Sequence, residues 1–271
     1  MSKDSLGDRM KFYERVGAVE KFMPTLPVIV RLDGRAFHSF TKGLKRPYDI
    51  GMSRLMIDTT KYLVEITNAV IGYTQSDEIT LILYSSTFAS QIYFDGRRDK
   101  INSILSASAS VFFNKYNKLN DKTGLFDCRS YQVPNRVEAI NTLIWREQDA
   151  TRNSIQMAGQ SVYSHKELQG KSCNEIQEML WQKGINWNEY PSFFKRGTYY
   201  QRKYNDVSVT FTKEELDKLP EKHHARTNPG IQIYRTEFRE IEMPPIMQVE
   251  NKEGVVFHGE TPIRKLGGTQ A

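Results

Sequence analysis

The sequence predicts an α+β protein whose core is an antiparallel sheet with the element order βαββαβ. Three observations predict this class. Residues 28–32 form a short apolar, β-branched run. Two further runs of this kind, 70–74 and 79–84, flank a single turn. Apolar residues recur at helical intervals over 48–66 and 98–119, between the strands.

The first half of the pattern places a carboxylate at each of two strand ends. Asp33 and Gly34 follow the strand at 28–32, and the turn between the two central strands contains Ser76 and Asp77. We expect a hairpin with Asp77 at its tip. The apolar face of the helix over 48–66 is formed by Ile50, Leu55, Met56, Ile57, Leu63, Val64 and Ile66.

The second half adds another helix and another strand. Ile101, Ile104, Leu105, Ala109, Val111 and Phe112 form the apolar face of the helix over 98–119. A strand is expected over 126–133, and Pro134 then opens a helix that runs through Trp145. This order is typical of a ferredoxin-like sheet or a polymerase/cyclase-type palm, in which helices pack on one face of antiparallel strands.

The rest of the chain predicts helices and then short strands. Residues 150–185 have a helical pattern with a break near Gly170, and a loop is expected over 184–191. From residue 197 onward the helical pattern gives way to turns and β-rich runs. The expected strands are 199–202, 207–211, 231–234 and 255–257.

This change of pattern predicts two domains. Residues 1–198 form a palm-like catalytic domain, and residues 199–271 form a C-terminal extension packed on it, with a mobile end at 267–271. The catalytic domain is expected to begin with an amphipathic helix whose apolar positions are Phe12, Val16, Val19 and Met23.

Composition excludes several classes of protein. Of 271 residues 39% are hydrophobic, and no apolar run approaches the 18 residues that indicate a membrane-spanning helix. The first five residues lack the apolar segment of a signal peptide, so we expect a cytoplasmic protein without membrane contact. Cys128 and Cys173 show no metal-ligand spacing and are expected to be free thiols in a reducing compartment.

The net charge of +6 leaves two interpretations open. Basic segments at 42–46, 97–100 and 222–226, and aromatic residues between 193 and 204, suit an RNA partner. Basic groups neutralise phosphates, and aromatic faces stack on unpaired bases. The same pattern also fits a solvated surface with tyrosines at its edge, because many proteins without a polyanionic partner reach this charge.

Asp33 and Asp77 are the expected metal ligands and catalytic carboxylates. Each lies at the edge of an apolar strand, and the carbonyl group of Gly34 supplies a third oxygen. Mg²⁺ usually binds through one or two carboxylates together with substrate phosphates. Two such ions stabilise both the attacking and the leaving oxygen of an in-line displacement. Strand alternation turns Glu78 to the opposite face from Asp77, so a structural role is expected for it.

The residues after the first strand are expected to bind a triphosphate. Free backbone N–H groups from Gly34 to His38 can form an anion-binding concavity, and Arg35, His38 and Ser76 can add charge or hydrogen bonds. Asp-Gly after a strand and a Ser-Asp-Glu turn are also ordinary turn signals. On the residues alone, a polymerase palm, a nucleotide cyclase and a non-catalytic sheet that binds RNA all remain open.

Two longer motifs narrow these alternatives. The sequences Arg-Leu-Asp-Gly-Arg-Ala-Phe-His-Ser-Phe at 31–40 and Tyr-Thr-Gln-Ser-Asp-Glu at 73–78 closely resemble the tRNA-histidine guanylyltransferase superfamily. The resemblance is collinear over about residues 28–198. Further matches are Trp-Arg-Glu-Gln-Asp at 145–149, Leu-Gln-Gly at 168–170, Asn-Glu at 174–175 and Lys-Arg-Gly-Thr at 195–198.

The resemblance implies a palm fold, two Mg²⁺ ions held by Asp33, Asp77 and the Gly34 carbonyl, and addition of nucleotides to the 5′ end of tRNA. ATP activates the 5′ end, and the 3′-hydroxyl of GTP or another NTP then attacks it, so synthesis runs in the 3′–5′ direction. A homotetramer that grasps tRNA is also implied. The implied nucleotide-binding residues are Asp33, Gly34, Arg35, Ala36, Phe37, His38, Lys42, Lys45, Arg46, Ser76 and Asp77.

Residues 151–157 depart from the family pattern. Eukaryotic members carry a His-Ile-Asn-x-x-Tyr-Asn signature here, whereas this chain has Thr-Arg-Asn-Ser-Ile-Gln-Met. The chain therefore resembles the bacterial and archaeal guanylyltransferase-like branch, which fills in 5′-truncated tRNAs against a template. Arg46 also stands where many members have lysine, and Cys173 lies near a position that is often basic. The candidate RNA contacts are Arg152, Asn153, Lys195 and Arg196.

Three functions remain as hypotheses. The first is a template-dependent 3′–5′ polymerase that repairs the 5′ end of tRNA. The second is a tRNA-histidine guanylyltransferase that adds G at position −1, and the missing signature argues against it. The third is a non-catalytic tRNA-binding protein. The paired Asp33 and Asp77 argue against this third function, because a pure binder gains nothing from two carboxylates beside phosphate.

Overall fold

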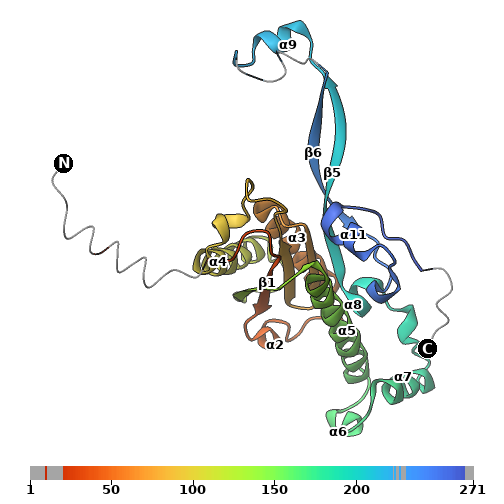
Figure 1. Cartoon of the computed structure of the whole chain (residues 1–271). Coiled ribbons are helices and arrows are strands. Elements are labelled where there is room, and N and C mark those ends of the chain that lie inside the picture. Colours follow the sequence, from red (N-terminus) through yellow and green to blue (C-terminus); the bar gives the residue numbers. More distant parts are fainter. Residues whose placement is uncertain (1–9, 11–20, 222, 224–225, 227–229, 266–271) are drawn as a thin grey trace.

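A single antiparallel sheet organises the chain in the computed structural model, which describes residues 10, 21–221, 223, 226 and 230–265 (Figure 1). Within these residues the sheet has six strands in the order β4-β1-β3-β2-β5-β6. The strands are β1 (Val28–Gly34), β2 (Ile71–Gln75), β3 (Glu78–Leu83), β4 (Phe126–Gln132), β5 (Thr198–Thr210) and β6 (Gly230–Ile241). An α+β protein with an antiparallel sheet is therefore confirmed.

The helices of the first half lie where the periodicity predicts them. The order over β1 to β4 is βαββαβ, as expected. Asp49 caps α3 because its side chain accepts a hydrogen bond from the N–H of Met52, and Asn135 caps α5 in the same way. The helices here are α2 (Phe37–Phe40), α3 (Ile50–Thr67), η1 (Tyr93–Gly96), α4 (Arg98–Tyr116) and α5 (Arg136–Gln160).

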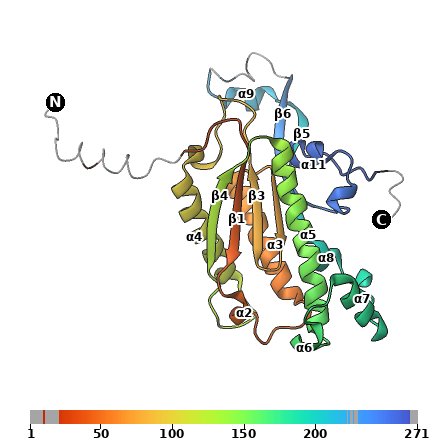
Figure 2. The same cartoon turned by 60° about the horizontal axis from the view of Figure 1, so that its bottom comes forward.

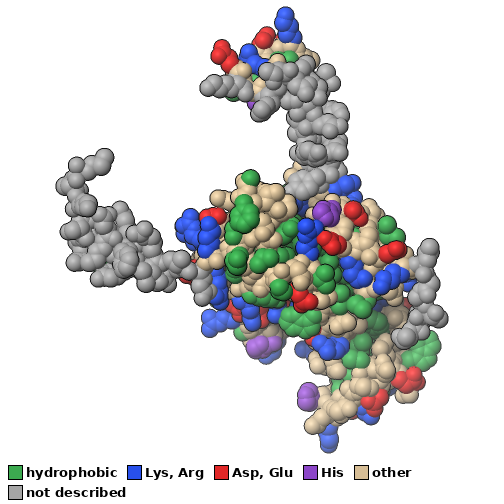
Figure 3. All heavy atoms as spheres, in the orientation of Figure 1, with side chains coloured by type: hydrophobic (Ala, Val, Ile, Leu, Met, Phe, Trp, Pro, Cys, Tyr) green, Lys and Arg blue, Asp and Glu red, His purple; other side chains and the backbone are tan. Residues whose placement is uncertain are grey.

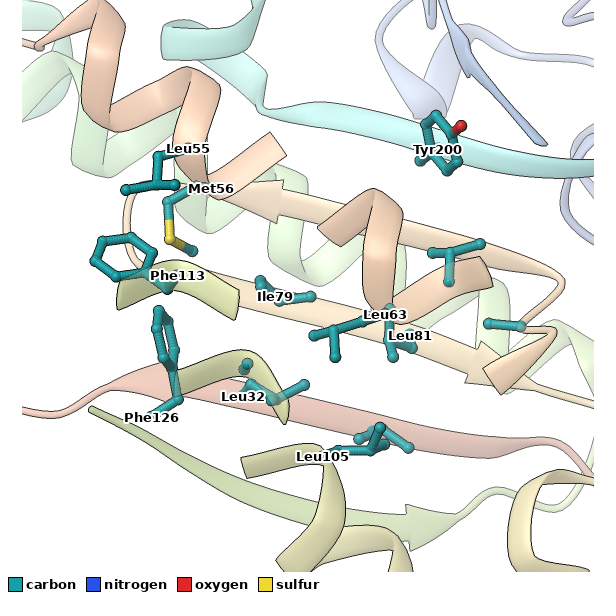
Figure 4. Close-up of a cluster of buried hydrophobic side chains, with 14 of the residues drawn as sticks. Leu32, Leu55, Met56, Leu63, Ile79, Leu81, Leu105, Phe113, Phe126 and Tyr200 are labelled. Carbon is teal, nitrogen blue, oxygen red and sulfur yellow. The ribbon is translucent and has the colours of Figure 1, made fainter. Parts of the chain in front are cut away.

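The α3 and α4 helices cover one face of the sheet. Leu63 of α3 and Phe113 of α4 are fully buried there against Leu32 of β1 and Leu81 of β3 (Figure 4). Burying a side chain of this size contributes about 1.5–3 kcal/mol. This layer packs against β1, at whose end Asp33 lies.

The opposite face is also covered, so the expectation of helices on one face is wrong. Ile29 of β1 and Ile82 of β3 pack there against Leu143 of α5 and Val255 (Figure 2). Residues 28–32 are apolar at four of five positions because β1 is buried on both faces, which removes the alternation of a half-exposed strand.

The helical segment after α5 has a different division from the predicted one. The helix that was expected to stop at Trp145 runs to Gln160, and the chain breaks first at 161–164 and again at 169–172. Ser164 and Ser172 each begin the next helix with a capping box. These elements are α6 (His165–Leu168), α7 (Cys173–Gln182), η2 (Trp187–Glu189) and α8 (Ser192–Arg196).

The C-terminal part corrects two expectations. The predicted short strands merge into β5 and β6, which pair along their whole length and project as an arm with α9 (Lys213–Asp217) at its tip (Figure 1). At its base β5 pairs with β2, so the sheet continues across position 198. Residues 255–257 lie in the helix α11 (Lys252–His258), which follows η3 (Ile246–Gln248), because a run of three apolar residues fits either structure.

Two expectations lie largely or wholly outside the described residues. They are the mobile end at 267–271 and the N-terminal amphipathic helix, of whose apolar positions only Met23 is described, as an exposed residue. In the part of the chain that is described, no helix is long and apolar enough to cross a membrane.

Candidate active site

A pocket of about 740 Å³ opens where β1 ends beside the β2–β3 hairpin. Three parts of the chain that are far apart in sequence line it: the segment from the end of β1 to the start of α3, the hairpin tip, and the ends of α5 and α8. The lining comprises Asp33, Gly34, Ala36, Phe37, His38, Thr41, Lys42, Leu44, Lys45, Arg46, Pro47, Tyr48, Asp49, Met52, Ser53, Gln75, Ser76, Asp77, Met157, Gln160, Phe193 and Phe194.

Asp33 and Asp77 meet at one edge of this pocket. Asp33 lies opposite Glu78 in the β1–β3 register, and the N–H of Gly34 donates to the carbonyl oxygen of Asp77 at 3.1 Å. Burial raises the pKa of Asp77, and the neighbouring charge of Asp33 raises it further, while a hydrogen bond from the Ser76 hydroxyl at 3.0 Å opposes the rise. Two carboxylates that repel one another at a partly buried edge favour a cation between them.

The donor set at this edge fits Mg²⁺. It consists of two carboxylates and the backbone around Gly34, all hard oxygen ligands, and leaves coordination positions for phosphate oxygens. Among the described residues no group of three or more His, Cys, Asp or Glu side chains could hold a metal ion. That part of the chain therefore offers no site made of protein side chains alone, and a substrate would supply some of the ligands of a metal bound here.

Gly34 has a structural role that the motif did not reveal. A β-carbon at this position would lie 2.6 Å from Cγ and 2.7 Å from Cε2 of Phe37. The Phe37 ring is buried and packs against Phe40, Phe113 and Phe126 at centroid distances of 5.0, 5.5 and 5.1 Å. The ring fixes the chain after β1, and only glycine leaves room for it.

The expectation of free N–H groups from Gly34 to His38 is wrong for the first two. The N–H of Gly34 is used by Asp77, and the N–H of Arg35 donates to the carbonyl of Leu125 at 2.8 Å. Arg35 does not line the pocket, and it lies on the outside of the turn that Ala36 makes with φ 55°. The other predicted nucleotide-binding residues all line the pocket.

Four basic side chains line the pocket on the α2 side. They are His38, Lys42, Lys45 and Arg46. Within the described part of the chain none of them forms an ion pair, so the charges of Lys42, Lys45 and Arg46 are available to a polyanion. The pocket therefore combines a carboxylate edge with a basic edge, as a metal-bound triphosphate requires.

The sequence did not identify the third wall. Tyr48 packs on Phe193 and Phe194 at 5.3 and 4.8 Å, and Met157 and Gln160 close the same side from α5. These residues are apolar or uncharged and lie more than 100 positions from Tyr48. No local signal assigns them to this pocket, because only the packing of α8 on α5 brings them there.

The motif at 145–149 fastens α5 to the back of the hairpin. The buried Arg146 forms ion pairs with Glu78 and with Asp149, the latter at 2.9 Å, and Arg31 pairs with Glu78 at 3.4 Å. Both guanidinium groups lie over the ring of Trp145. Glu78 is thus held by Arg31 and Arg146 and does not line the pocket.

Glu147 of the same motif ties the sheet to the C-terminal segment. It accepts hydrogen bonds from the hydroxyl of Tyr199 at 2.9 Å and from the N–H of Ile246 at 2.8 Å. Burial raises the pKa of Glu147, although these hydrogen bonds and the charge of Arg196 oppose the rise.

The four candidate RNA contacts do not line the pocket. Arg152 and Asn153 lie on the exposed side of α5, where Arg152 pairs with Asp149 at 2.7 Å. The ammonium group of Lys195 donates to the carbonyl of Asn188. Arg196 lines a separate cavity of about 360 Å³ together with Glu147.

Comparison with known proteins decides the family. The family model described as tRNAHis guanylyltransferase matches residues 7–134. The tRNA(His) guanylyltransferase of Saccharomyces cerevisiae is 31% identical over 204 residues, which cover 67% of this chain and 84% of that protein. The chain belongs to the tRNA(His) guanylyltransferase family. The resemblance of the two motifs is confirmed, as is the expectation of a nucleotidyltransferase.

Solved structures of the family share this architecture. A bacterial tRNA(His) guanylyltransferase (Thg1)-like protein in complex with ATP is 36% identical, with a TM-score of 0.69, over 73% of this chain and 88% of that one. A bacterial protein of the same description in complex with GTP is 30% identical, with a TM-score of 0.69, over 90% of this chain and 94% of that one. Because the match covers 90% of this chain, the shared architecture extends beyond the motifs into the C-terminal part.

Proposed function

We propose that this family member adds nucleotides to the 5′ end of tRNA in the 3′–5′ direction and restores 5′-truncated tRNAs against a template. The observation that carries the proposal is the pocket in which Asp33 and Asp77 face a rim of unpaired basic side chains. The bacterial relatives in complex with ATP and with GTP support nucleotides as its ligands. The order β4-β1-β3-β2 supports a ferredoxin-like, palm-type sheet.

Each group of the pocket has a part in this reaction. Asp33, Asp77 and the Gly34 carbonyl would hold Mg²⁺, which when bound neutralises triphosphate charge and stabilises the oxygens of the displacement. Lys42 and Lys45 bind phosphate oxygens, together with Arg46 and His38. The 3′-hydroxyl of the NTP attacks the activated 5′ phosphorus of the tRNA, and AMP or pyrophosphate leaves. The protein contributes alignment and charge neutralisation.

Template dependence is supported by the end of α5. Residue 157, where eukaryotic members end their signature with asparagine, is methionine here and lines the pocket. A thioether cannot donate the hydrogen bonds of an amide, so a contact that could fix one base is lost. Selection of the incoming nucleotide is then left to pairing with the opposite strand. The family name favours the other candidate, addition of G at position −1 to tRNA-histidine. Nucleotide addition to four truncated tRNAs that differ only in the base opposite the gap separates the two.

Alanine at Asp33 or at Asp77 tests the catalytic assignment. We expect each variant to lose nucleotide addition, by at least 100-fold, and to retain tRNA binding, because other residues of the pocket supply the positive charge. Asp58→Ala is the matched control, because Asp58 is an exposed carboxylate on α3 outside the pocket. Turnover by both pocket variants at the control rate would contradict the assignment.

A homotetramer also remains a prediction, which light scattering tests.

A further inference from the structure

A second cavity, of about 280 Å³, lies at the opposite end of the sheet from the nucleotide pocket. Its walls are the end of β3, the loop over 85–92, Arg136 at the start of α5, Arg202 of β5 and His258 at the end of α11. Because β3 starts beside Asp77 and ends at this cavity, the length of a six-residue strand separates the two sites by about 17–20 Å. The cavity is therefore not a subsite of the nucleotide pocket.

Two arginines hold fixed positive charge in this cavity. The Arg136 guanidinium lies over the rings of Tyr84 and Phe257 at 5.2 and 5.7 Å, and its Nη1 donates to Glu253 at 2.8 Å. The buried Arg202 donates to the carbonyl of Asn68 at 2.6 Å. Both guanidinium groups are thus oriented before any ligand arrives, which lowers the entropy that a ligand must overcome.

The remaining lining suits an anion. None of the lining residues is acidic, and Glu253 contacts Arg136 from outside the lining. A guanidinium has five N–H donors, and in the described part of the chain Arg136 uses one. The side chains of Ser86, Gln91 and His258 likewise find no hydrogen-bond partner among the described residues, so they are free to donate to a ligand.

We propose that this cavity binds a backbone phosphate of the RNA substrate, far from the point of nucleotide addition. The inference rests on the proposed function for the identity of the polymer. A whole NTP is the poorer occupant, because the volume is less than half that of the nucleotide pocket. The faces of Tyr84 and Phe257 on this side are also covered by Arg136 and are not open to a base.

The position of the cavity fits a polymer that spans both sites. Basic side chains and a histidine lie at the foot of the β5–β6 arm, with acidic side chains beside them (Figure 3). An RNA whose 5′ end reaches Asp33 and Asp77 can extend over one strand length to this region. A phosphate contact there carries no sequence information but fixes the register of the RNA on the protein.

The test uses a charge placed inside or outside the cavity on the same loop. Ser86→Asp puts a carboxylate into the lining, whereas Ala89→Asp puts it on the same exposed loop outside the lining. Both variants change the net charge equally, so any difference reports the cavity. The affinity for a tRNA transcript is measured by fluorescence anisotropy from 50 to 300 mM KCl. We expect Ser86→Asp to bind about tenfold more weakly than Ala89→Asp, with a slope of log K against log salt that is smaller by about one.

Three results would overturn the inference. Equal affinity and equal salt slope for the two variants would show that no phosphate occupies the cavity. Loss of pyrophosphate or ATP binding in Ser86→Asp, with tRNA binding unchanged, would assign the cavity to a free nucleotide or its product. A changed mass in light scattering for Ser86→Asp alone would assign it to a contact between subunits. Arg136→Gln is a second variant, whose thermal unfolding is checked first. We expect it, like Ser86→Asp, to bind tRNA more weakly and with a smaller salt slope.

The two proposals fail separately. If the wild-type protein binds tRNA but adds no nucleotide, the proposed function is wrong and the salt slopes still test the cavity. If nucleotide addition proceeds but Ser86→Asp and Ala89→Asp bind tRNA with equal affinity and salt slope, the cavity assignment alone is wrong.

Discussion

Replacing Gly34 by alanine is expected to damage the site through packing, without changing any charged group. The added methyl group would lie 2.6 and 2.7 Å from two ring carbons of Phe37, so one of them must move by about 1 Å. The ring cannot yield freely because Phe40, Phe113 and Phe126 surround it. Overpacking of this kind costs about 1–3 kcal/mol of unfolding free energy.

The consequence for activity follows from the position of the clash. The N–H of Gly34 holds the carbonyl of Asp77, so a displaced strand end changes the distance between the two carboxylates. A misplacement of 1 Å costs about 100-fold in rate. Urea unfolding and nucleotide addition are measured for Gly34→Ala and for the double variant Gly34→Ala/Phe37→Leu, in which a smaller side chain gives way. We expect the double variant to recover part of the activity that Gly34→Ala loses. Wild-type stability and turnover in Gly34→Ala would refute the reasoning.

Three further predictions concern buried groups. Burial raises the pKa of Glu147 in the folded protein. The contribution that its protonation makes to the unfolding free energy is therefore fully present below the ordinary pKa of 4.5 and is lost as pH rises through the pKa of the folded protein. As pH rises across this window, the unfolding free energy of Glu147→Gln, measured in urea, should therefore fall less than that of the wild type. Parallel plots of unfolding free energy against pH for the two proteins would contradict the prediction. Burial raises the pKa of Cys128 to about 12, so iodoacetamide at pH 8 should label Cys128 only in the unfolded chain, as peptide mass spectrometry shows. Arg146→Met leaves the carboxylate of Glu78 with Arg31 alone, and we expect a loss of about 2–4 kcal/mol in urea unfolding; a loss below 1 kcal/mol would show that the ion pair is dispensable.

The sequence predicts the first half of the fold well because its strands are short apolar, β-branched runs, whereas its helices repeat apolar residues at helical intervals. The apolar run at 28–32 predicts a strand and the helical spacing over 48–66 predicts a helix, and the structure has β1 and α3 there. The prediction divided α5 by ending one helix at Trp145 and starting another helical pattern at residue 150, although nothing between Trp145 and Gly159 stops a helix. Residues 255–257 were misassigned because three apolar residues carry no period.

The candidate site likewise contains residues that the sequence predicts and residues that it does not. Asp33 and Asp77 could be found because one lies at the end of an apolar strand and the other in the turn between two such strands, and strand pairing then brings them together. Tyr48 and Phe194 could not be found, because their meeting depends on how α8 packs across the pocket. Arg35 was assigned to the nucleotide by position in a motif, whereas the turn at Ala36 takes it out of the pocket.

The most direct test of the central claim is addition to a tRNA that lacks its first nucleotide and carries a 5′-triphosphate. Four versions of the tRNA differ only in the base opposite the gap, and each NTP is supplied separately with Mg²⁺. The account predicts that the added nucleotide follows Watson–Crick pairing in all four, and that Asp33→Ala and Asp77→Ala add none. Addition of guanylate alone, and only to tRNA-histidine, would contradict template-dependent repair.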